Sequence, residues 1–291
     1  MASNGVSGTR SMEIDSGGVT IHVEVTGEGR PVVLLHGFPD SGALWRHQVP
    51  ALADAGFQVI VPDLRGFGAS GVPEEVDAYS MIHSVGDVVA ILDHLGLERA
   101  HIVGHDLGSA LAWAFGAFLP ERVDHLVTLS VGQASSFRAA GIAQLSLSWY
   151  VFFFQFVGVA EQWLSADGWA NYREWSDHPD TEAIIARWEA TDSLTAGLNW
   201  YRANITPEGW VAPPLDLPLV QAPTMGVWSS GDFALTEVQM SGSGDYVAGP
   251  WRYERIEGPG HWMQLEAPDE VNRLLLDFLP CLLYTSDAAD E

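Results

Sequence analysis

The sequence contains no lysine, a single cysteine and no long acidic run. All 13 basic residues are arginine, against 38 aspartate and glutamate residues, so the formal net charge is −25. This charge disfavours nucleic-acid binding, because a phosphate backbone requires a clustered positive surface. It disfavours adhesion to anionic lipid for the same reason. With Cys281 alone, the chain forms no intramolecular disulfide and no cysteine-based metal site.

The first ten residues lack the apolar run of a signal peptide, which predicts a cytoplasmic protein. Residues 139–160 carry no charge over 22 positions, a length that could span a bilayer. Four polar side chains interrupt this stretch, namely Gln144, Ser146, Ser148 and Gln155. A helix facing lipid would not carry four such groups, because hydrocarbon leaves them without partners. We therefore interpret the stretch as an apolar lid over a pocket.

Apolar residues make up 47% of the chain and aromatic residues 11%, enough for a buried core and against intrinsic disorder. A hairpin signal at residues 12–25 is followed by alternating strand and helix patterns, which predict an α/β fold with a doubly wound, mostly parallel sheet. Residues 134–215 show aromatic-rich helical patterns without strand signals. They predict a helical cap inserted between two parts of the sheet domain, residues 1–133 and 216–280. The tail, residues 281–291, has no amphipathic pattern and resembles translated vector sequence, so it is excluded from the fold prediction.

The segment Gly104-His105-Asp106-Leu107-Gly108 joins a predicted strand to a predicted helix. It matches the nucleophile elbow G-x-S-x-G, with aspartate in place of serine. A turn this sharp brings the flanking positions against neighbouring backbone, so those positions require very small residues. The turn exposes the Asp106 side chain above the sheet. Taken alone, the pattern leaves a second interpretation open, in which Asp106 only caps the helix that follows.

Two residues further along the chain complete a catalytic constellation with Asp106. Asp232 follows one of the last predicted strands and His261 follows the final one. The order Asp106, Asp232, His261 is the chain order of nucleophile, acid and histidine in this architecture. All three lie at the carboxyl ends of predicted strands, where open α/β sheets place their sites. Glu237 and Asp245 are alternative candidates for the acid.

The sequence resembles the α/β-hydrolase-fold epoxide hydrolases over residues 12–280. The matching segments are residues 36–41, 63–70, 104–108, 231–235 and 260–264, with 148–150, 154–155 and 198–202 in the predicted cap. The resemblance implies that the chain opens an apolar epoxide to a vicinal diol through a covalent ester on Asp106. His261 and Asp232 would then activate the hydrolysing water. A carboxylate suits this chemistry because it is ionised at neutral pH and attacks carbon without a base. No cofactor or metal is implied.

The resemblance also assigns residues that surround the reacting atoms. Tyr150 and Tyr201, from the cap, would donate to the oxygen of the opening ring, and the backbone N–H groups of Phe38 and Leu107 would form an oxyanion hole. Composition alone would place Tyr150 in the core of the cap. The pocket wall is expected to include Trp149, Phe154, Trp200 and Trp262. Asp63 and Arg65 are expected to pair and hold a loop.

Two other functions share these features. Haloalkane dehalogenases of this fold use the same aspartate and carry tryptophan directly after it, where this chain has Leu107. Many epoxide hydrolases carry that tryptophan too, so Leu107 departs from both patterns. Fluoroacetate dehalogenases use arginine near the elbow, where this chain has Ser109 and Ala110. Neither dehalogenase explains the two tyrosines.

The third alternative is a non-catalytic ligand-binding relative. Such a protein needs a pocket but not the catalytic residues, so the presence of all three triad residues argues against it. The expected partners are a small apolar epoxide and water, without nucleic acid or membrane. The sequence leaves the oligomeric state open, including a homodimer, as well as the size and stereochemistry of the substrate.

Overall fold

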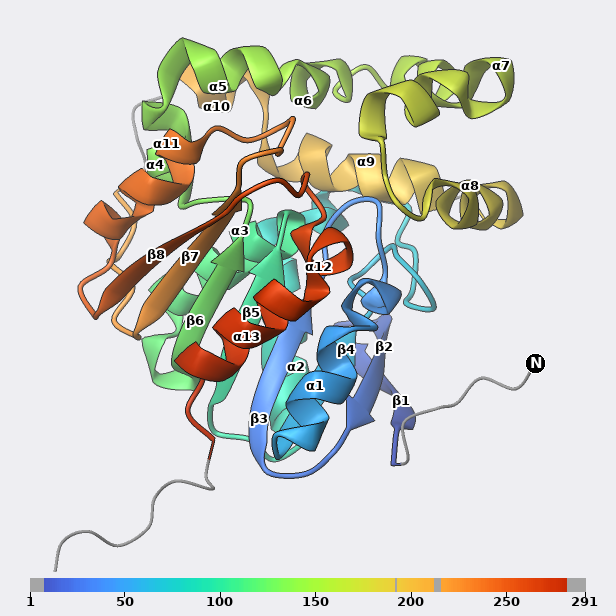
Figure 1. Cartoon of the computed structure of the whole chain (residues 1–291). Helices are drawn as coiled ribbons and strands as arrows, with labels where there is room; N and C mark the ends of the chain where they lie inside the picture. The colour runs from blue at the N-terminus through green and yellow to red at the C-terminus, as the bar shows by residue number, and fades with distance from the viewer. Residues whose placement is uncertain (1–7, 192, 212–215, 282–291) are drawn as a thin grey trace, which may run out of the picture.

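The computed structural model describes residues 8–191, 193–211 and 216–281, arranged as a central sheet with helices on both faces and a helical layer above it (Figure 1). The eight strands run in the order β1-β2-β4-β3-β5-β6-β7-β8. Their bounds are β1 (Arg10–Ser16), β2 (Val19–Thr26), β3 (Arg30–Leu35), β4 (Phe57–Pro62), β5 (Ala100–His105), β6 (Val123–Leu129), β7 (Thr224–Ser229) and β8 (Trp251–Ile256). The tail predicted at residues 281–291 lies outside the described residues except for Cys281.

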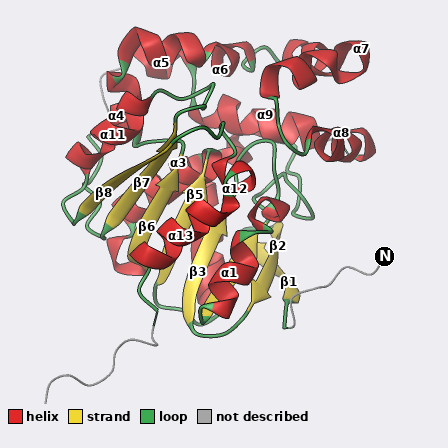
Figure 2. Cartoon of the chain, in the orientation of Figure 1, coloured by secondary structure: helices red, strands yellow, loops and turns green. Residues whose placement is uncertain are grey.

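The sheet is mostly parallel, which confirms the predicted fold class. Strands β1 and β2 form the predicted antiparallel hairpin, and β2 pairs antiparallel with β4. Every pair from β4 through β8 is parallel, so the carboxyl ends of these strands meet at one edge of the sheet (Figure 2). That edge faces the helical layer, and the predicted nucleophile, acid and histidine all follow strands that end there.

Helices cover both faces of the sheet because its central strands are apolar on both sides. In β3, Val32 and Leu34 pack into one hydrophobic cluster and Val33 and Leu35 into the other, as the two-residue period of a strand requires. Helices α1 and α13 cover one face, while α2 and α3 cover the other (Figure 1). The helices of the sheet domain are α1 (Gln48–Asp54), α2 (Met81–His94), α3 (Leu107–Phe118), α11 (Glu237–Ser241), α12 (Met263–Glu266) and α13 (Pro268–Phe278). The short 3₁₀ helices are η1 (Gly42–Trp45), η2 (Val76–Tyr79), η3 (Pro120–Arg122) and η4 (Gly242–Tyr246).

A helical layer lies between β6 and β7 in the chain and above the carboxyl edge of the sheet (Figure 1). Its helices are α4 (Ala134–Ala139), α5 (Gly141–Leu147), α6 (Trp149–Phe153), α7 (Val159–Ser176), α8 (Thr181–Ala190), α9 (Ser193–Asn204) and α10 (Pro207–Val211), with a kink in α7 at residues 166–169. The first of them begins at residue 134, and the end predicted at residue 215 lies outside the described residues.

The uncharged stretch at residues 139–160 is divided among several short helices rather than forming one. Two of its polar residues make structural contacts. The Gln144 side chain donates to the Ala234 carbonyl of the sheet domain at 2.9 Å, and Gln155 donates to the Tyr201 carbonyl of α9 at 3.3 Å. Within the described part of the chain, no helix combines the length and the hydropathy needed to cross a membrane.

His101, at the amino end of β5, makes the free energy of unfolding depend on pH. His101 is fully buried, and its ring lies 5.0 Å from that of His125. Burial, followed by the charge on His125, lowers the pKa of His101 to about 3. Below the ordinary pKa of about 6.5, the unfolded chain therefore binds a proton at this position that the folded chain does not. The free energy of unfolding then decreases as the pH falls, by about 1.4 kcal/mol per pH unit for one such group.

We expect the His101→Leu variant to lose this contribution. Its free energy of unfolding should depend on pH less steeply than that of the unsubstituted protein between pH 6 and pH 4, by about 1.4 kcal/mol per unit. Urea unfolding at a series of pH values measures the slope. The His94→Leu variant, at an exposed position on α2, is the control and should keep the original slope. Parallel curves for the protein and the His101 variant would contradict this account.

Candidate active site

Asp106 occupies a strained turn between β5 and α3. Its backbone has φ 53° and ψ −120°, a left-handed conformation that a residue other than glycine adopts at a cost of about 1–3 kcal/mol. The two glycines of the motif make the turn possible. A Cβ atom on Gly104 would collide with the backbone of Gly108, and one on Gly108 would collide with the backbone at the end of β3. The sharp turn therefore presents the Asp106 side chain at the carboxyl edge of the sheet.

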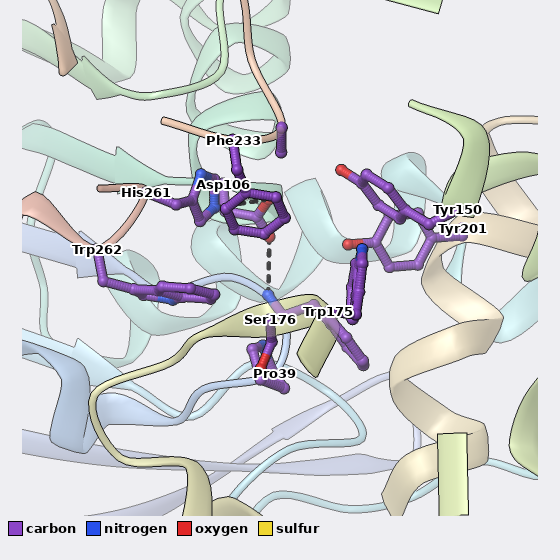
Figure 3. Close-up of a pocket in the computed structure, with 11 residues that line it drawn as sticks. Pro39, Asp106, Tyr150, Trp175, Ser176, Tyr201, Phe233, His261 and Trp262 are labelled. Carbon is purple, nitrogen blue, oxygen red and sulfur yellow. Dashed lines mark hydrogen bonds and ion pairs between the residues drawn. The ribbon is translucent and has the colours of Figure 1, made fainter. Parts of the chain in front are cut away.

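The Asp106 carboxylate makes no capping hydrogen bond to the helix that follows it. Its Oδ1 instead accepts a hydrogen bond from the Phe38 N–H at 2.8 Å (Figure 3). Gly37 permits this approach, since a Cβ atom at that position would lie 2.5 Å from the Cβ of Asp106. The geometry does not support the interpretation in which Asp106 is only a helix cap.

His261 lies between two carboxylates. Its Nδ1 is 2.9 Å from Asp232 Oδ2, and its Nε2 is 3.5 Å from Asp106 Oδ2. The other Asp232 oxygen, Oδ1, accepts hydrogen bonds from the Ala234 and Leu235 N–H groups, at 2.9 and 3.0 Å. Asp106, His261 and Asp232 are far apart in the sequence, and the fold brings them together in one line of contacts, as predicted.

The two alternative acids lie elsewhere. Glu237 accepts from the Tyr253 hydroxyl and from Arg255, each at 2.9 Å, and Asp245 is exposed. Of the three candidate acids, only Asp232 contacts His261.

The charges at the site stabilise an imidazolium. Burial lowers the pKa of His261, but the two neighbouring carboxylates outweigh burial and raise it to about 10. Burial raises the pKa of Asp232, yet the His261 charge, its hydrogen bond and the two backbone donors lower it below the ordinary range. At neutral pH, His261 is therefore protonated and Asp232 is ionised.

Tyr150 from α6 and Tyr201 from α9 approach the site from the helical layer. Their rings lie 6.1 Å apart, both side chains are buried, and their hydroxyl groups point toward the side of the cavity that holds Asp106 (Figure 3). Burial, and then the charge on Asp106, raises the pKa of each phenol well above its usual range. Both are therefore neutral O–H donors at physiological pH.

Two contacts fix the helices that carry these tyrosines relative to each other. The Gln155 amide donates to the Tyr201 carbonyl at 3.3 Å, and Arg202 Nε donates to the Phe154 carbonyl at 2.9 Å. Arg202 also pairs with Glu161 of α7 at 2.9 Å.

The residues around Asp106 line a small cavity that is partly open to solvent. The lining residues are Phe38, Pro39, Asp106, Tyr150, Trp175, Ser176, Tyr201, Phe233, Ala234, His261 and Trp262. These lining residues include Trp262, one of the four aromatic residues predicted for the wall.

The other three predicted wall residues lie elsewhere, which corrects that part of the prediction. Trp149 is 44% exposed on α6, and Trp200 is buried on α9, where its Nε1 donates to the Arg65 carbonyl at 3.0 Å. Each precedes a cavity-lining tyrosine by one position, and adjacent residues on a helix point in different directions. Phe154 packs behind both tyrosines, with ring centroids 5.5 and 5.2 Å away.

Several lining residues were not predicted. Three of them directly follow predicted site residues in the chain: Pro39 follows Phe38, and Phe233 and Ala234 follow Asp232. That proximity in the sequence could have identified them as lining residues. Trp175 and Ser176, at the end of α7, have no motif that marks them.

A second buried group joins the helical layer to the sheet domain beside the cavity. The Asp40 carboxylate accepts from His178 Nε2 and from Trp262 Nε1, each at 3.1 Å. His178 Nδ1 accepts from the Asp180 N–H at 2.8 Å, which leaves the proton on Nε2. Burial raises the pKa of Asp40, but His178 lowers it below the usual range. An ionised Asp40 thus fixes the Trp262 wall of the cavity and the chain that follows α7. Among the described residues, no group of three or more histidine, cysteine, aspartate or glutamate side chains is arranged to hold a metal ion.

Comparison with known proteins agrees with this geometry. A family model described as alpha/beta hydrolase fold matches residues 30–268. The chain is 32% identical to Epoxide hydrolase A of Mycobacterium tuberculosis, over 91% of this chain and 96% of that protein. It is 31% identical to Epoxide hydrolase 3 of Xenopus tropicalis, over 90% of this chain and 75% of that protein.

Solved structures show the same relationship. Epoxide Hydrolase A from Mycobacterium thermoresistibile is 30% identical, with a TM-score of 0.75 over 93% of this chain and 98% of that one. An epoxide hydrolase from Vigna radiata is 27% identical, with a TM-score of 0.78 over 94% of this chain and 99% of that one.

Proposed function

The chain belongs to the epoxide hydrolases of the α/β-hydrolase fold, and from this premise we propose that it opens an apolar epoxide to a vicinal diol through an ester on Asp106. The observation that carries the proposal is the continuous line of contacts through Asp106, His261 and Asp232, beneath two buried phenols. Residues 134–215 act as the cap that brings those phenols to the site.

The first step is attack of Asp106 on a ring carbon. The Phe38 N–H holds Oδ1, so Oδ2 is the oxygen that attacks. A bond forms between Oδ2 and the carbon while the carbon–oxygen bond of the ring breaks, and the electron pair moves to the epoxide oxygen. Ring strain and the fixed position of the carboxylate both favour the step.

Tyr150 and Tyr201 stabilise the charge that develops on the epoxide oxygen. Both phenols remain protonated at neutral pH because their pKa values are raised, so each presents an O–H donor. An alkoxide is a much stronger base than a phenolate, so one phenol transfers its proton as the ring opens. Acid assistance of this kind typically accelerates a reaction by about 10²- to 10⁴-fold.

The second step is hydrolysis of the ester. Esterification removes the charge on Asp106, one of the two carboxylates that raise the pKa of His261. The protonated His261 then gives up its proton more easily, and this proton restores the phenol that protonated the ring oxygen. The neutral His261 ring next takes a proton from a water that attacks the Asp106 Cγ. The Asp232 carboxylate stabilises the imidazolium that forms again.

The tetrahedral intermediate places negative charge on Oδ1. The N–H groups of Phe38 and Leu107 donate to this oxygen, and one such donor is worth about 3 kcal/mol. The bond between Cγ and Oδ2 then breaks, and Oδ2 takes the second proton of the attacking water and leaves as a hydroxyl group of the diol. The water oxygen stays in Asp106, which is again a carboxylate beside a protonated His261.

A single turnover in ¹⁸O-water tests this route. Enzyme in excess over a small epoxide such as 1,2-epoxypentane should release unlabelled diol, while peptide mass spectrometry finds the label in Asp106. Label in the diol alone would mean that water attacks the epoxide directly, which contradicts an Asp106 ester.

The dehalogenase alternative is measured on the same enzyme preparation. Incubation with 1-chloropentane or fluoroacetate should release no halide above the uncatalysed rate. Halide release without diol formation from any epoxide would overturn the proposed function in favour of dehalogenation.

A further inference from the structure

Trp175, the residue before the last of α7, contributes a polar group to the cavity that the proposed mechanism does not use. Its ring lies 5.0 Å from that of Tyr150, 5.5 Å from that of Phe154 and 6.2 Å from that of Phe233. Figure 3 shows the indole beside the two tyrosines, along the wall of the cavity. Its Nε1 is buried and has no hydrogen-bond partner among the described residues.

A buried N–H group without an acceptor destabilises a protein, and most such groups are satisfied by protein, water or ligand. Two other indole groups, those of Trp45 and Trp210, also lack a partner within the described residues, but neither lines the cavity. Trp262 does line it, and its Nε1 is already bonded to Asp40. Among the indole N–H groups of the described cavity wall, that of Trp175 is therefore the one left free to donate a hydrogen bond to a substrate.

The acceptor for this donor must be something other than the ring oxygen. An epoxide oxygen has two lone pairs, and the hydroxyl groups of Tyr150 and Tyr201 supply two donors for them. A third donor to the same oxygen has no lone pair left in the ground state. Because the Trp175 ring is in contact with that of Tyr150, a second acceptor close to the oxirane would lie within its reach.

We propose that Trp175 determines specificity by donating its Nε1–H to a second oxygen of the substrate, carried on the carbon next to the oxirane ring. The substrate class is then small 2,3-epoxy ethers and alcohols, whose remaining atoms pack against the aromatic wall of Phe233 and Trp262. This inference rests on the proposed epoxide hydrolysis and names its substrate class.

A matched pair of substrates tests the inference. Methyl glycidyl ether and 1,2-epoxypentane have the same shape and the same number of heavy atoms, and they differ by one ether oxygen in place of a methylene. The Trp175→Phe variant keeps an aromatic ring against Tyr150 and removes the N–H. We expect its kcat/KM to fall about tenfold for the ether, the effect of one hydrogen bond, mainly through KM. Loss of packing should affect 1,2-epoxypentane as much as the ether, so the ratio of the two kcat/KM values, ether to 1,2-epoxypentane, should fall about tenfold.

The retained activity on 1,2-epoxypentane shows that the variant is folded. Trp210→Phe is the matched control, because it removes an indole N–H that also lacks a partner among the described residues but lies off the cavity; it should leave both values unchanged. An equal loss on both substrates would mean that Trp175 serves the ring oxygen or only packs, and no loss on the ether would mean that its N–H is not used; either result overturns the inference. Absence of diol from both epoxides with the unsubstituted enzyme would instead overturn the proposed function itself.

Discussion

Replacement of Asp106 by alanine is expected to lower the rate of diol formation by at least about 10⁴-fold, the scale of loss when a covalent nucleophile is removed. The variant lacks the oxygen that bonds to carbon, and no other carboxylate of the described cavity wall can take its place. The loss is measured as the rate of diol formation from 1,2-epoxypentane, with the diol quantified by chromatography. Asp245→Ala, at an exposed position, should retain full activity and serves as the control.

The same variant gives a second readout that does not depend on activity. Without the Asp106 carboxylate, one of the two charges that raise the pKa of His261 to about 10 is gone, while burial still lowers it. The His261 pKa should therefore fall, which an NMR titration of the ring protons measures. Turnover within tenfold of the unsubstituted enzyme, or a His261 pKa unchanged by the substitution, would contradict the pairing of these two residues.

The turn at Asp106 and the approach of Asp232 and His261 to it could be predicted from the sequence, because both depend on simple rules of strand and turn geometry. Gly104 and Gly108 are required by a turn whose neighbours are backbone atoms, so their spacing records the geometry directly. Asp232 and His261 follow parallel strands, whose carboxyl ends meet at one edge whatever the details of packing.

The cavity wall could not be predicted in the same way. Which aromatic side chain of a cap helix faces the site depends on how the helix is rotated about its axis, and a one-residue difference separates exposed Trp149 from buried Tyr150. Trp175 lies in the cavity because α7 ends beside Phe233, a contact between segments 58 positions apart that no local pattern encodes.

One predicted ion pair was wrong for a similar reason. Arg65 pairs with Asp87 of α2, with its Nε 2.7 Å from Oδ2, rather than with Asp63. Asp63 accepts instead from the N–H groups of Gly42 and Ala69, at 2.7 and 2.8 Å. Proximity in the chain suggested the pair, whereas the packing of α2 against the sheet brings a buried partner from 22 positions away.

Replacement of both cap tyrosines by phenylalanine is expected to reduce ring opening by about 10³- to 10⁴-fold, the range of general acid assistance. Each single variant should lose less, about tenfold to 10²-fold, because the remaining phenol still donates to the epoxide oxygen. The two effects are thus coupled, since Tyr150 and Tyr201 serve the same atom and their rings lie 6.1 Å apart.

The step that slows identifies the role. Under single-turnover conditions, formation of the Asp106 ester should slow in the double variant, while hydrolysis of ester once formed should keep its rate, because neither phenol is the base for the attacking water. Tyr172→Phe is the matched control: Tyr172 is buried in the same helical layer but does not line the cavity, so its loss should affect neither step. A double variant that opens epoxides at the original rate would remove the phenols from the mechanism and leave Asp106, His261 and Asp232 to act without them. A double variant slowed in hydrolysis alone would assign the phenols to the second step instead, where they would hold the water rather than the opening ring.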